Sequence, residues 1–496
     1  MGTINPARVR FAPSPTGRMH LGSARTALYN YLLAKRTGGQ FILRIEDTDM
    51  NRFVEGSGEE LMHGLRWLGL QWDEGLEVGG PYGPYLQSDR KSIYQEYARQ
   101  LVETGHAYPC FCSRERLESV RLEQMKQKES LHYDGLCRRL TPQESAKKLA
   151  GGESHVIRFK TPHEGSIIAH DALRGDIVVE NKNIDDYVLV KSDGWALYHL
   201  AAMVDDHMMK ITHVIRGSEW LSTFPLHVHI VRAFGWDEPE WIHLSIFLKP
   251  SGKGKMSKRD AVQALDSGHS IFVTDLEKLG YVPEGVLNWI LLMGWGIAEG
   301  EFMTLPEMIQ KFDVDRVNPS PAAIDFAKLD YFSGAHIRNL SVQEVAARVK
   351  PYFLKEGYQV DDEKLLEIIP IIRERLVTLD DALKFAGFFF RDQVEPPAAD
   401  LVGKDLTIAE SVNILDRSYQ ILSSLNEFTP ELMEAPMRAL VDELGLKGGQ
   451  VFGILRVALT GQMVSPPLFE SMQIIGKPKI LERIKKAIEI LESIPG

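Results

Sequence analysis

The sequence predicts an α/β protein in which a parallel sheet is interrupted by an α+β insertion and followed by an all-α C-terminal region. Three observations support this prediction. A β-loop-α-β pattern occupies the first 46 residues, strand patterns with a hairpin turn occupy the middle, and almost only helical patterns follow residue 263. A chain of 496 residues is also too long for one hydrophobic core, so several domains are expected.

The first β-loop-α-β unit begins with residues 8–12 (RVRFA), a short extended apolar run. Residues 22–36 then repeat apolar side chains at helical spacing until Gly38 and Gly39 end the pattern. Residues 41–46 (FILRIE) predict a second buried strand. The loop before the helix therefore follows a parallel strand at its carboxyl end, where α/β proteins bind ligands.

The middle of the chain predicts strands at residues 156–160, 176–181, 188–191 and 195–201. A Ser-Asp-Gly turn at residues 192–194 favours a hairpin between the last two, which indicates an antiparallel insertion. Residues 212–217 predict a further strand of the α/β fold, and a helix follows it to about Ala233.

The C-terminal region shows repeated helix starts. Capping boxes, in which a hydroxyl and a glutamate three residues later satisfy each other's backbone donors, begin at Thr304, Ser341 and Thr407. Thr429 precedes a proline at the first position of another predicted helix. The last helix carries an apolar face made of Ile480, Leu481, Ile484, Ile488 and Leu491.

The composition limits the partners and the compartment. A formal net charge of −11 argues against nucleic-acid binding by bulk attraction, so any such binding must use local basic patches. The N-terminus lacks an apolar segment of signal-peptide length, and no stretch reaches the ~18 apolar residues of a membrane helix. A cytoplasmic protein that does not enter the membrane is expected.

The strongest chemical signal is the basic segment KPSGKGKMSKRD, which contains Lys255-Met256-Ser257-Lys258-Arg259. Its glycines predict a mobile loop, and mobile lysines can neutralise charge that develops on a departing polyphosphate. A solvated run of charges is the ordinary alternative for so short a stretch.

A second signal, PSPTGRMHLG at residues 13–22, lies near the other end of the chain. Its glycines let the backbone approach a ligand, and the helix that follows turns its N-terminal amides toward a phosphate. His20 can donate a hydrogen bond to that phosphate. Taken alone, a turn histidine that caps a helix is commoner than a catalytic one.

The two segments together resemble the paired signatures of class I aminoacyl-tRNA synthetases, here HLGS and KMSKR. Five segments are more specifically similar to bacterial glutamyl-tRNA synthetases, and they extend from residue 10 to residue 461: RFAPSPTGRMHLG, FILRIEDTD, WLGLQWDEG, YHLAAMVDDHMMKITHVIRGSEWL and GQVFGILRVALTG. The resemblance implies a Rossmann-like catalytic domain and a helical anticodon-binding region. It also implies ligation of L-glutamate to tRNA(Glu) with ATP and Mg²⁺, by a monomer.

The resemblance assigns functional residues by position. The implied catalytic residues are His20, Lys255 and Lys258. Glutamate binding falls to Arg10, Ala12, Ser14, Glu46, Tyr198, Arg216 and Trp220. ATP binding falls to Thr16, His20, Gly22, Ser23, Glu219, Leu248, Lys255, Met256, Ser257, Lys258 and Arg259. In this assignment Glu46 holds the ammonium group, and arginine forks grip the side-chain carboxylate and reject neutral glutamine. Either arginine alone would be read as a surface ion pair.

The sequence contains two candidate metal sites, and it supports one of them better than the other. All three cysteines of the chain lie between Cys110 and Cys137, which suits a metal site better than a disulfide framework. Some members of the family hold zinc with three thiolates and a tyrosine, here Cys110, Cys112, Cys137 and Tyr133. Three buried free thiols are the alternative. Asp47-Thr48-Asp49 resembles a Mg²⁺-binding D-x-D pattern, but such short patterns are mostly turn residues, and Mg²⁺ is expected to arrive with ATP.

The resemblance also implies a domain plan. The catalytic domain occupies residues 1–108 and 201–262, the acceptor-stem-binding insertion 109–200, a helical linking domain 263–335 and the anticodon-binding domain 336–496. Arg375 occupies a position associated with accepting only tRNA(Glu), where a guanidinium can contact an unstacked base. An ion pair with Glu374 is the alternative for this arginine.

Other functions explain less of the sequence. A glutaminyl enzyme is disfavoured by the PSPTG loop, and a truncated tRNA-modifying relative is disfavoured by the long helical region. If the protein were a small-molecule adenylyl- or cytidylyltransferase, about half of the chain would have no evident function. A non-enzymatic paralogue would be expected to have lost one of the two signatures, and both are intact.

Overall fold

The computed structural model describes residues 5–49, 54–256, 258–297 and 300–494. It divides the chain into two compact units. The first unit comprises Met1–Glu277 and Val286–Phe326, and the second comprises Lys278–Gly285 and Ala327–Gly496. In the described part of the chain, every helix is too short or too polar to cross a membrane.

A parallel sheet forms the centre of the first unit. Strands β1 (Arg8–Phe11), β2 (Gln40–Leu43) and β3 (Glu74–Gly75) pair in that order, with all three parallel. Strands β9 (His213–Gly217) and β10 (Glu240–Leu244) also pair in parallel. The start of β9 adjoins β1, because the backbone of Thr212 donates to the carbonyl of Arg8 at 2.9 Å. The predicted parallel sheet is confirmed.

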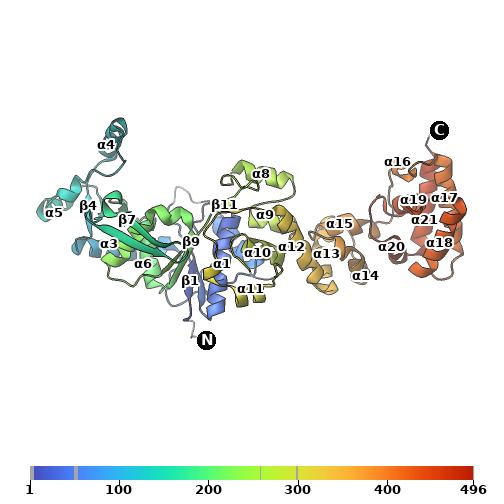
Figure 1. The fold of residues 1–496 in the computed structure, drawn as a ribbon, viewed down its shortest axis with the longest axis horizontal. Helices are drawn as coiled ribbons and strands as arrows, with labels where there is room; N and C mark the ends of the chain where they lie inside the picture. Colours follow the sequence, from blue (N-terminus) through green and yellow to red (C-terminus); the bar gives the residue numbers. More distant parts are fainter. Residues whose placement is uncertain (1–4, 50–53, 257, 298–299, 495–496) are drawn as a thin grey trace. The chain divides into compact units, whose positions relative to one another are not determined.

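Helix α1 (Leu21–Thr37) crosses from β1 to β2 and packs on both strands and on β9 (Figure 1). Its fully buried side chains include Ala24, Leu28 and Leu32, which follow the predicted helical spacing. Gly38 ends the helix in the left-handed conformation at φ 66°, which glycine adopts without a steric cost. The first β-loop-α-β unit therefore forms as the sequence predicts.

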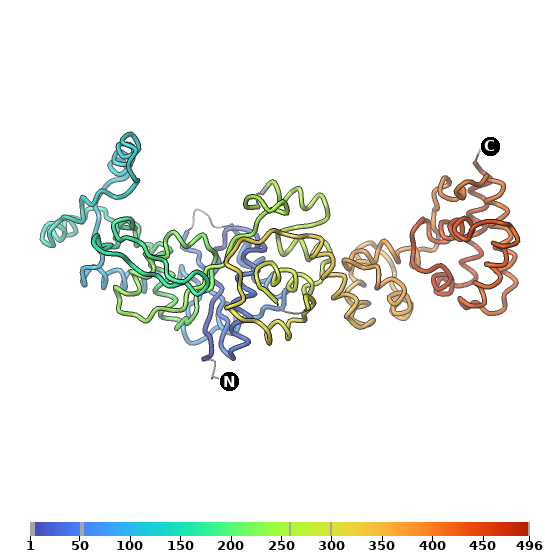
Figure 2. The backbone as a smooth tube through the Cα atoms, in the orientation of Figure 1, coloured from blue at the N-terminus to red at the C-terminus, as the bar shows by residue number. Residues whose placement is uncertain are grey.

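The insertion lies between α3 (Lys91–Glu103) and α6 (Tyr198–Met208), and its path can be followed along the tube in Figure 2. Its antiparallel sheet has the order β4-β5-β8, and β6 pairs with β7 as a separate hairpin. These elements are β4 (Ala107–Cys110), α4 (Arg114–Gln127), α5 (Pro142–Ala150), β5 (Val156–Phe159), β6 (Ser166–Asp171), β7 (Gly175–Glu180) and β8 (Val188–Val190).

The strand predicted at residues 195–201 is wrong. The turn before it forms, but only Ala196 makes a strand-like bridge, with Val190, and α6 begins at Tyr198. Residues 200–206 are buried around the whole helix, so this segment has no polar face that would reveal a helical period. Tyr198 therefore lies on the first turn of a helix.

The remaining elements of residues 54–326 complete the α/β fold. They are α2 (Ser57–Trp67), α7 (Phe224–Ala233), β11 (Phe247–Leu248), α8 (Lys258–Asp266), α9 (Val273–Lys278), α10 (Pro283–Leu292), α11 (Leu305–Lys311) and β12 (Ala322–Ala323). Strand β12 pairs with β11 in parallel and is a short exception to the helices expected after residue 263.

The second unit is helical over the residues that the structure describes. Its elements include α12 (Phe326–Asn339), α13 (Val342–Lys355), α14 (Asp362–Ile372), α15 (Asp381–Ala386), α16 (Ala398–Leu401), α17 (Ile408–Ser424), α18 (Pro430–Leu444), α19 (Gly448–Thr460), α20 (Leu468–Ile475) and α21 (Lys477–Glu492). The carboxylates of Glu344 and Glu410 accept from the predicted cap residues' backbone N–H groups at 2.9 and 2.7 Å. In α21 the predicted face is buried at Ile480, Ile484 and Leu491.

Candidate active site

The two signature segments lie together in the first unit. The backbone of Leu21 donates to the carbonyl of Ile271 at 2.9 Å, and the backbone of Val273 donates to the carbonyl of Met19 at 3.0 Å. This pairing fixes the segment that follows α8 beside the loop that precedes α1. Because α8 begins at Lys258, the basic loop is tethered next to the HLGS segment, although more than 230 residues separate the two in sequence.

His20 is the N-cap of α1, so the capping role of this histidine is real. Its Nδ1 accepts hydrogen bonds from the backbone of Gly22 at 3.0 Å and of Ser23 at 3.3 Å. In a neutral ring this leaves the hydrogen on Nε2, which lies 3.4 Å from the Ser23 hydroxyl and is the nitrogen that can donate to a phosphate. Loss of water around the ring, followed by the positive charge of Lys255, lowers the pKa of His20. Capping therefore orients the ring without using its donor.

The basic loop begins as a narrow hairpin. Leu248 of β11 bridges to Lys255, and the backbone of Lys249 donates to the carbonyl of Gly254 at 3.0 Å. Gly252 has a φ of 72°, which a residue with a side chain rarely adopts. Lys255 is exposed, and its charge reaches His20. The hairpin thus directs the loop toward the HLGS segment.

The other residues assigned to ATP take varied positions. Met256 is half-buried and Arg259 is exposed, whereas Ser257 and the side chain of Lys258 lie outside the described residues. Glu219 is exposed on a 3₁₀ turn, and its charge also acts on His20. Thr16 is exposed, and its backbone donates to the carbonyl of Ser14 in the turn that precedes His20.

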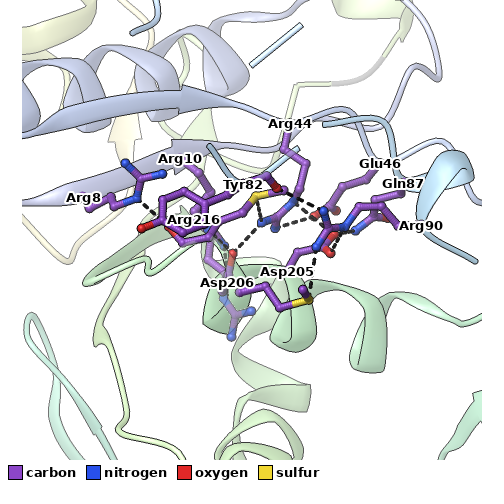
Figure 3. A network of polar contacts seen from close by, with 12 residues as sticks. Arg8, Arg10, Arg44, Glu46, Tyr82, Gln87, Arg90, Asp205, Asp206 and Arg216 are labelled. Atoms are coloured by element: carbon purple, nitrogen blue, oxygen red, sulfur yellow. Dashed lines mark hydrogen bonds and ion pairs between the residues drawn. The ribbon is translucent and has the colours of Figure 1, made fainter. Parts of the chain in front are cut away.

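Buried arginines and carboxylates line the carboxyl ends of β1 and β2 (Figure 3). The Nε and Nη2 of Arg10 donate to the two carboxylate oxygens of Asp206 at 3.0 and 3.3 Å. Arg44, which is fully buried, donates to Asp206 at 2.8 Å and to Glu46 at 3.0 Å. Burial raises the pKa of Glu46, and the charges of Arg44 and Arg10 oppose that rise. Glu46 is therefore held in place as the partner of a buried cation.

The neighbouring carboxylate, Asp205, has its own set of donors. Arg90 donates to it at 2.6 Å, Gln87 at 2.8 Å and Tyr94 at 2.9 Å. The Nε of Arg44 is 3.6 Å from the same carboxylate. Two successive residues of α6 therefore connect Arg44 with both Arg10 and Arg90, in one buried network (Figure 3).

Arg216, near the carboxyl end of β9, differs from these arginines in its hydrogen-bond partners. Its side chain is buried, yet no carboxylate among the described residues forms an ion pair with it. Its guanidinium donates to Tyr198 at 3.4 Å, to His227 at 3.0 Å and to His243 at 2.9 Å. The ring of Tyr198 stacks on Trp220 with centroids 3.8 Å apart. The site thus contains a buried cation with neutral partners.

The structure brings most of the predicted glutamate-binding residues together. Burial raises the pKa of Tyr198, and the charges of Arg216, Glu46 and Arg10 all act on it. Ala12 directly follows β1, and the backbone of Glu46 donates to the carbonyl of Pro13 at 3.0 Å. The exposed Ser14 is next in the same loop.

Sequence reasoning missed the residues that hold this site in shape. They are Arg44, Asp171, Asp206, His227 and His243, all of them buried. Arg44 and Asp206 lie inside segments that carried the family resemblance. In the sequence, however, an arginine two residues before Glu46 has the appearance of an ordinary strand residue. The two histidines carry no local signal, because their role depends on contacts with residues far away in sequence.

The three cysteines form a cluster in the insertion. The Sγ atoms of Cys110, Cys112 and Cys137 all lie within 4.8 Å of one another. The hydroxyl of Tyr133 lies 3.4 Å from both Cys110 and Cys112. Tetrahedral zinc with Zn–S bonds of about 2.3 Å requires sulfur atoms roughly 3.8 Å apart, which is compatible with this spacing. Among the described residues, this is the one group of three or more His, Cys, Asp or Glu side chains placed to share a metal ion.

The D-x-D pattern has a different environment. Asp47 is buried, and its carboxylate accepts from the backbone of Ser88 at 2.8 Å. In such short patterns an aspartate commonly accepts a hydrogen bond from the backbone and thereby holds a loop.

In the second unit, Arg375 lies on a 3₁₀ turn after α14 and is exposed. No ion pair forms between it and Glu374 or any other carboxylate of the described residues; Glu374 instead lies 4.0 Å from Arg373. Burial, and then the charge of Arg375, lowers the pKa of Arg456 in α19. The charge of Arg375 therefore acts on a second cation that is far from it in sequence.

Comparisons with known proteins agree with this arrangement. Residues 6–331 match the family described as tRNA synthetases class I (E and Q), catalytic domain, and residues 344–488 match an anticodon binding domain. A glutamate–tRNA ligase of Roseiflexus castenholzii is 42% identical over 99% of this chain and 98% of its own length. One of Dehalococcoides mccartyi is 40% identical over 99% of this chain and 100% of its own length.

Solved structures are similar over the same extent. The crystal structure of a glutamate tRNA ligase from Elizabethkingia meningosepticum, in complex with its amino acid, has a TM-score of 0.89 and 38% identity, and covers 98% of this chain and 99% of its own. A glutamate-tRNA synthetase from Elizabethkingia anophelis has a TM-score of 0.86 at the same identity, covering 98% of this chain and 100% of its own. Because the family models and the relatives together span nearly the whole sequence, the chain belongs to the class I tRNA synthetases, within the glutamate–tRNA ligase family.

Proposed function

We propose that this protein ligates L-glutamate to the 3′ end of tRNA(Glu) in two steps, first forming glutamyl-adenylate from ATP and then transferring glutamate to the tRNA. The observation that supports the choice of amino acid is Arg216, a buried cation without a carboxylate partner among the described residues. A buried charge is costly unless it is paired, so this position favours an anionic ligand. The side-chain carboxylate of glutamate supplies that anion, and the amide of glutamine does not.

The first step needs positioning rather than a covalent intermediate. Glu46 binds the ammonium group and Arg216 binds the side-chain carboxylate, which directs the α-carboxylate toward the α-phosphate of ATP. His20 donates from Nε2 to that phosphate, and Lys255 and Lys258 neutralise the departing pyrophosphate. Mg²⁺, which arrives with ATP, neutralises phosphate charge. The terminal adenosine of the tRNA then attacks the adenylate carbonyl and releases AMP.

In the proposed function, three regions of the chain contact the tRNA. Residues 109–200 bind the acceptor stem, 263–335 contact the stem, and 336–496 bind the anticodon. Since the chain is acidic overall, these contacts use local groups of cations such as Arg375 and Arg456. The enzyme acts as a monomer in the cytoplasm, where its product enters translation.

An aminoacylation assay tests the proposed function directly. The purified protein is offered glutamate or glutamine, each with tRNA(Glu) or tRNA(Gln). Only glutamate with tRNA(Glu) should give charged tRNA and AMP. Charging of glutamine, or ATP binding without any charging, would refute the proposal.

Arg375→Gln tests tRNA choice. An arginine that bonds to a base contributes about 1–3 kcal/mol, so kcat/KM for tRNA(Glu) should fall by roughly 5- to 150-fold. Charging of tRNA(Gln) should become detectable in the same assay. Arg438→Gln is the matched control, because Arg438 is an exposed arginine of the same unit that pairs with Glu434. Equal behaviour of the two variants would assign Arg375 to the solvated surface.

We also propose that the thiol cluster holds a structural zinc ion with Tyr133 as its fourth ligand. The wild-type protein should contain about one zinc per chain by elemental analysis, and Cys137→Ser should contain almost none. His132→Ala controls for the neighbouring histidine and should keep the metal. Wild-type protein that is purified without chelators and folds with no zinc would leave three buried thiols as the better description.

A further inference from the structure

The side chain of Arg216 rests between two buried histidines from different elements. Its Nε donates to Nε2 of His243 in β10 at 2.9 Å, and its Nη2 contacts Nδ1 of His227 in α7 at 3.0 Å. Both histidine side chains have no exposed surface. These contacts fix two edges of the guanidinium plane, and among the described residues no carboxylate forms an ion pair with it, although the charge of Asp206 acts on it from farther away.

The proton positions on both rings follow from this geometry. A guanidinium only donates hydrogen bonds, so His243 must present a lone pair on Nε2 and His227 must present one on Nδ1. The hydrogen of His243 is then on Nδ1, from which it is donated to the carboxylate of Asp171 at 2.7 Å. The backbone N–H of His243 donates to the same carboxylate oxygen at 3.0 Å. Asp171 therefore selects the tautomer of His243 that accepts from Arg216.

His227 shows the opposite tautomer. Its Nε2 carries the hydrogen and faces Nδ1 of His199 at 2.9 Å. Burial and the charge of Arg216 lower the pKa of His227 well below its usual value and lower the pKa of His199 to about 4. For His243, burial is again the main cause that lowers the pKa to about 4, although Asp171 opposes it. Both rings in contact with Arg216 are neutral.

Comparison with Arg10 shows why neutral partners matter for Arg216. Arg10 is gripped at two nitrogens by Asp206, so a carboxylate already neutralises its charge. A carboxylate in place of either histidine would orient Arg216 equally well, but it would cancel the charge and repel a second carboxylate. A neutral imidazole nitrogen orients the guanidinium without that cost.

We propose that His243 and His227 are positioning residues that hold Arg216 through neutral nitrogen acceptors and thereby keep its charge available for the side-chain carboxylate of glutamate. Asp171, which lies on β6 of the insertion, completes the arrangement by fixing the tautomer of His243. The inserted segment thus contributes to amino-acid recognition in addition to its proposed contact with tRNA. The inference rests on the proposed role of Arg216.

Amide substitutions test this role because asparagine and glutamine imitate different ring nitrogens. The asparagine amide lies near the place of Nδ1, and the glutamine amide lies near the place of Nε2. At position 243 the contact with Arg216 uses Nε2, so His243→Gln keeps an acceptor there and His243→Asn loses it. At position 227 the contact uses Nδ1, so His227→Asn keeps the acceptor and His227→Gln loses it.

The expected result is a reciprocal pattern in steady-state aminoacylation. His243→Asn and His227→Gln should raise the KM for glutamate at least about tenfold, with the KM for ATP changed less than about twofold. His243→Gln and His227→Asn should remain within about threefold of the wild type in both constants. If the histidines only fill space, side-chain volume alone determines the effect of each variant. The same amide, asparagine or glutamine, would then give the lower KM for glutamate at both positions, and that outcome would overturn the proposal.

Two further measurements separate the possible failures. If Arg216→Gln leaves the KM for glutamate unchanged, the proposed role of Arg216 is wrong; if it raises the KM while all four histidine variants behave as wild type, only the positioning role is wrong. Nitrogen-15 NMR of histidine-labelled wild-type protein should show His243 protonated at Nδ1 and His227 at Nε2. A doubly protonated ring at either position near neutral pH would overturn the proposal even if no variant folds.

Discussion

Arg216→Gln is expected to lower kcat/KM for glutamate by roughly 10²- to 10³-fold. Truncating one partner of a buried, hydrogen-bonded charge pair typically costs about 2–5 kcal/mol, and about 1.4 kcal/mol corresponds to a factor of ten. Here the loss falls on the complex, since Arg216 has no internal carboxylate whose pairing would be lost as well. The preference for glutamate over glutamine should fall together with kcat/KM, because the site would no longer present an unpaired cation.

Steady-state aminoacylation with varied glutamate measures this effect, and the KM for ATP reports whether the rest of the site is intact. Arg232→Gln is a suitable control, because Arg232 is an exposed arginine on α7 that pairs with Glu238. It should change kcat/KM by less than about twofold. An Arg216 variant that retains wild-type selectivity would show that the anion is bound elsewhere.

Removing both lysines of the basic loop, with Lys255→Ala and Lys258→Ala combined, should slow the chemical step by about 10³-fold or more. The loss of a single group that stabilises transition-state charge costs about 10²- to 10³-fold. Because the proposed lysines act on charge that develops on pyrophosphate, the effect should appear in kcat and leave the KM for glutamate nearly unchanged.

Single-turnover formation of glutamyl-tRNA by rapid quenching measures this rate without a contribution from product release. Lys253→Ala is the matched control, since Lys253 is an exposed lysine of the same loop that carries no proposed catalytic role. It should remain within about threefold of the wild-type rate. A double variant with an unchanged single-turnover rate would contradict the role given to the loop.

The sequence predicted the fold well where local pattern decides the structure. Helix α1 has a clear apolar period and a glycine end, and capping boxes mark helix starts at Ser341 and Thr407. Residues 195–201 were misjudged because a helix buried on all sides shows no period, and tertiary packing decided between strand and helix.

The site was predicted only in part, for a related reason. Arg10, Glu46 and Arg216 were identified through family positions, and the structure does bring them together. Their partners were not identified, because a contact such as that between Arg216 and His243 depends on neighbouring strands and not on sequence spacing. Sequence reasoning located the groups proposed to meet the substrate and missed the groups that orient them.

The buried network around α6 also has a consequence for the electrostatic balance of binding. Seven ionisable side chains lie together in it: Arg10, Arg44, Arg90, Arg216, Glu46, Asp205 and Asp206. With all of them ionised, four cations face three anions; the nearby carboxylate of Asp171 is offset by Arg174 at 3.5 Å and does not alter this balance. The proposed ligand, glutamate, is a monoanion that would make the set electroneutral, whereas zwitterionic glutamine would leave one excess positive charge. Under the proposed function, selection between the two amino acids is a property of the whole buried charge set, in which every carboxylate of the network takes part.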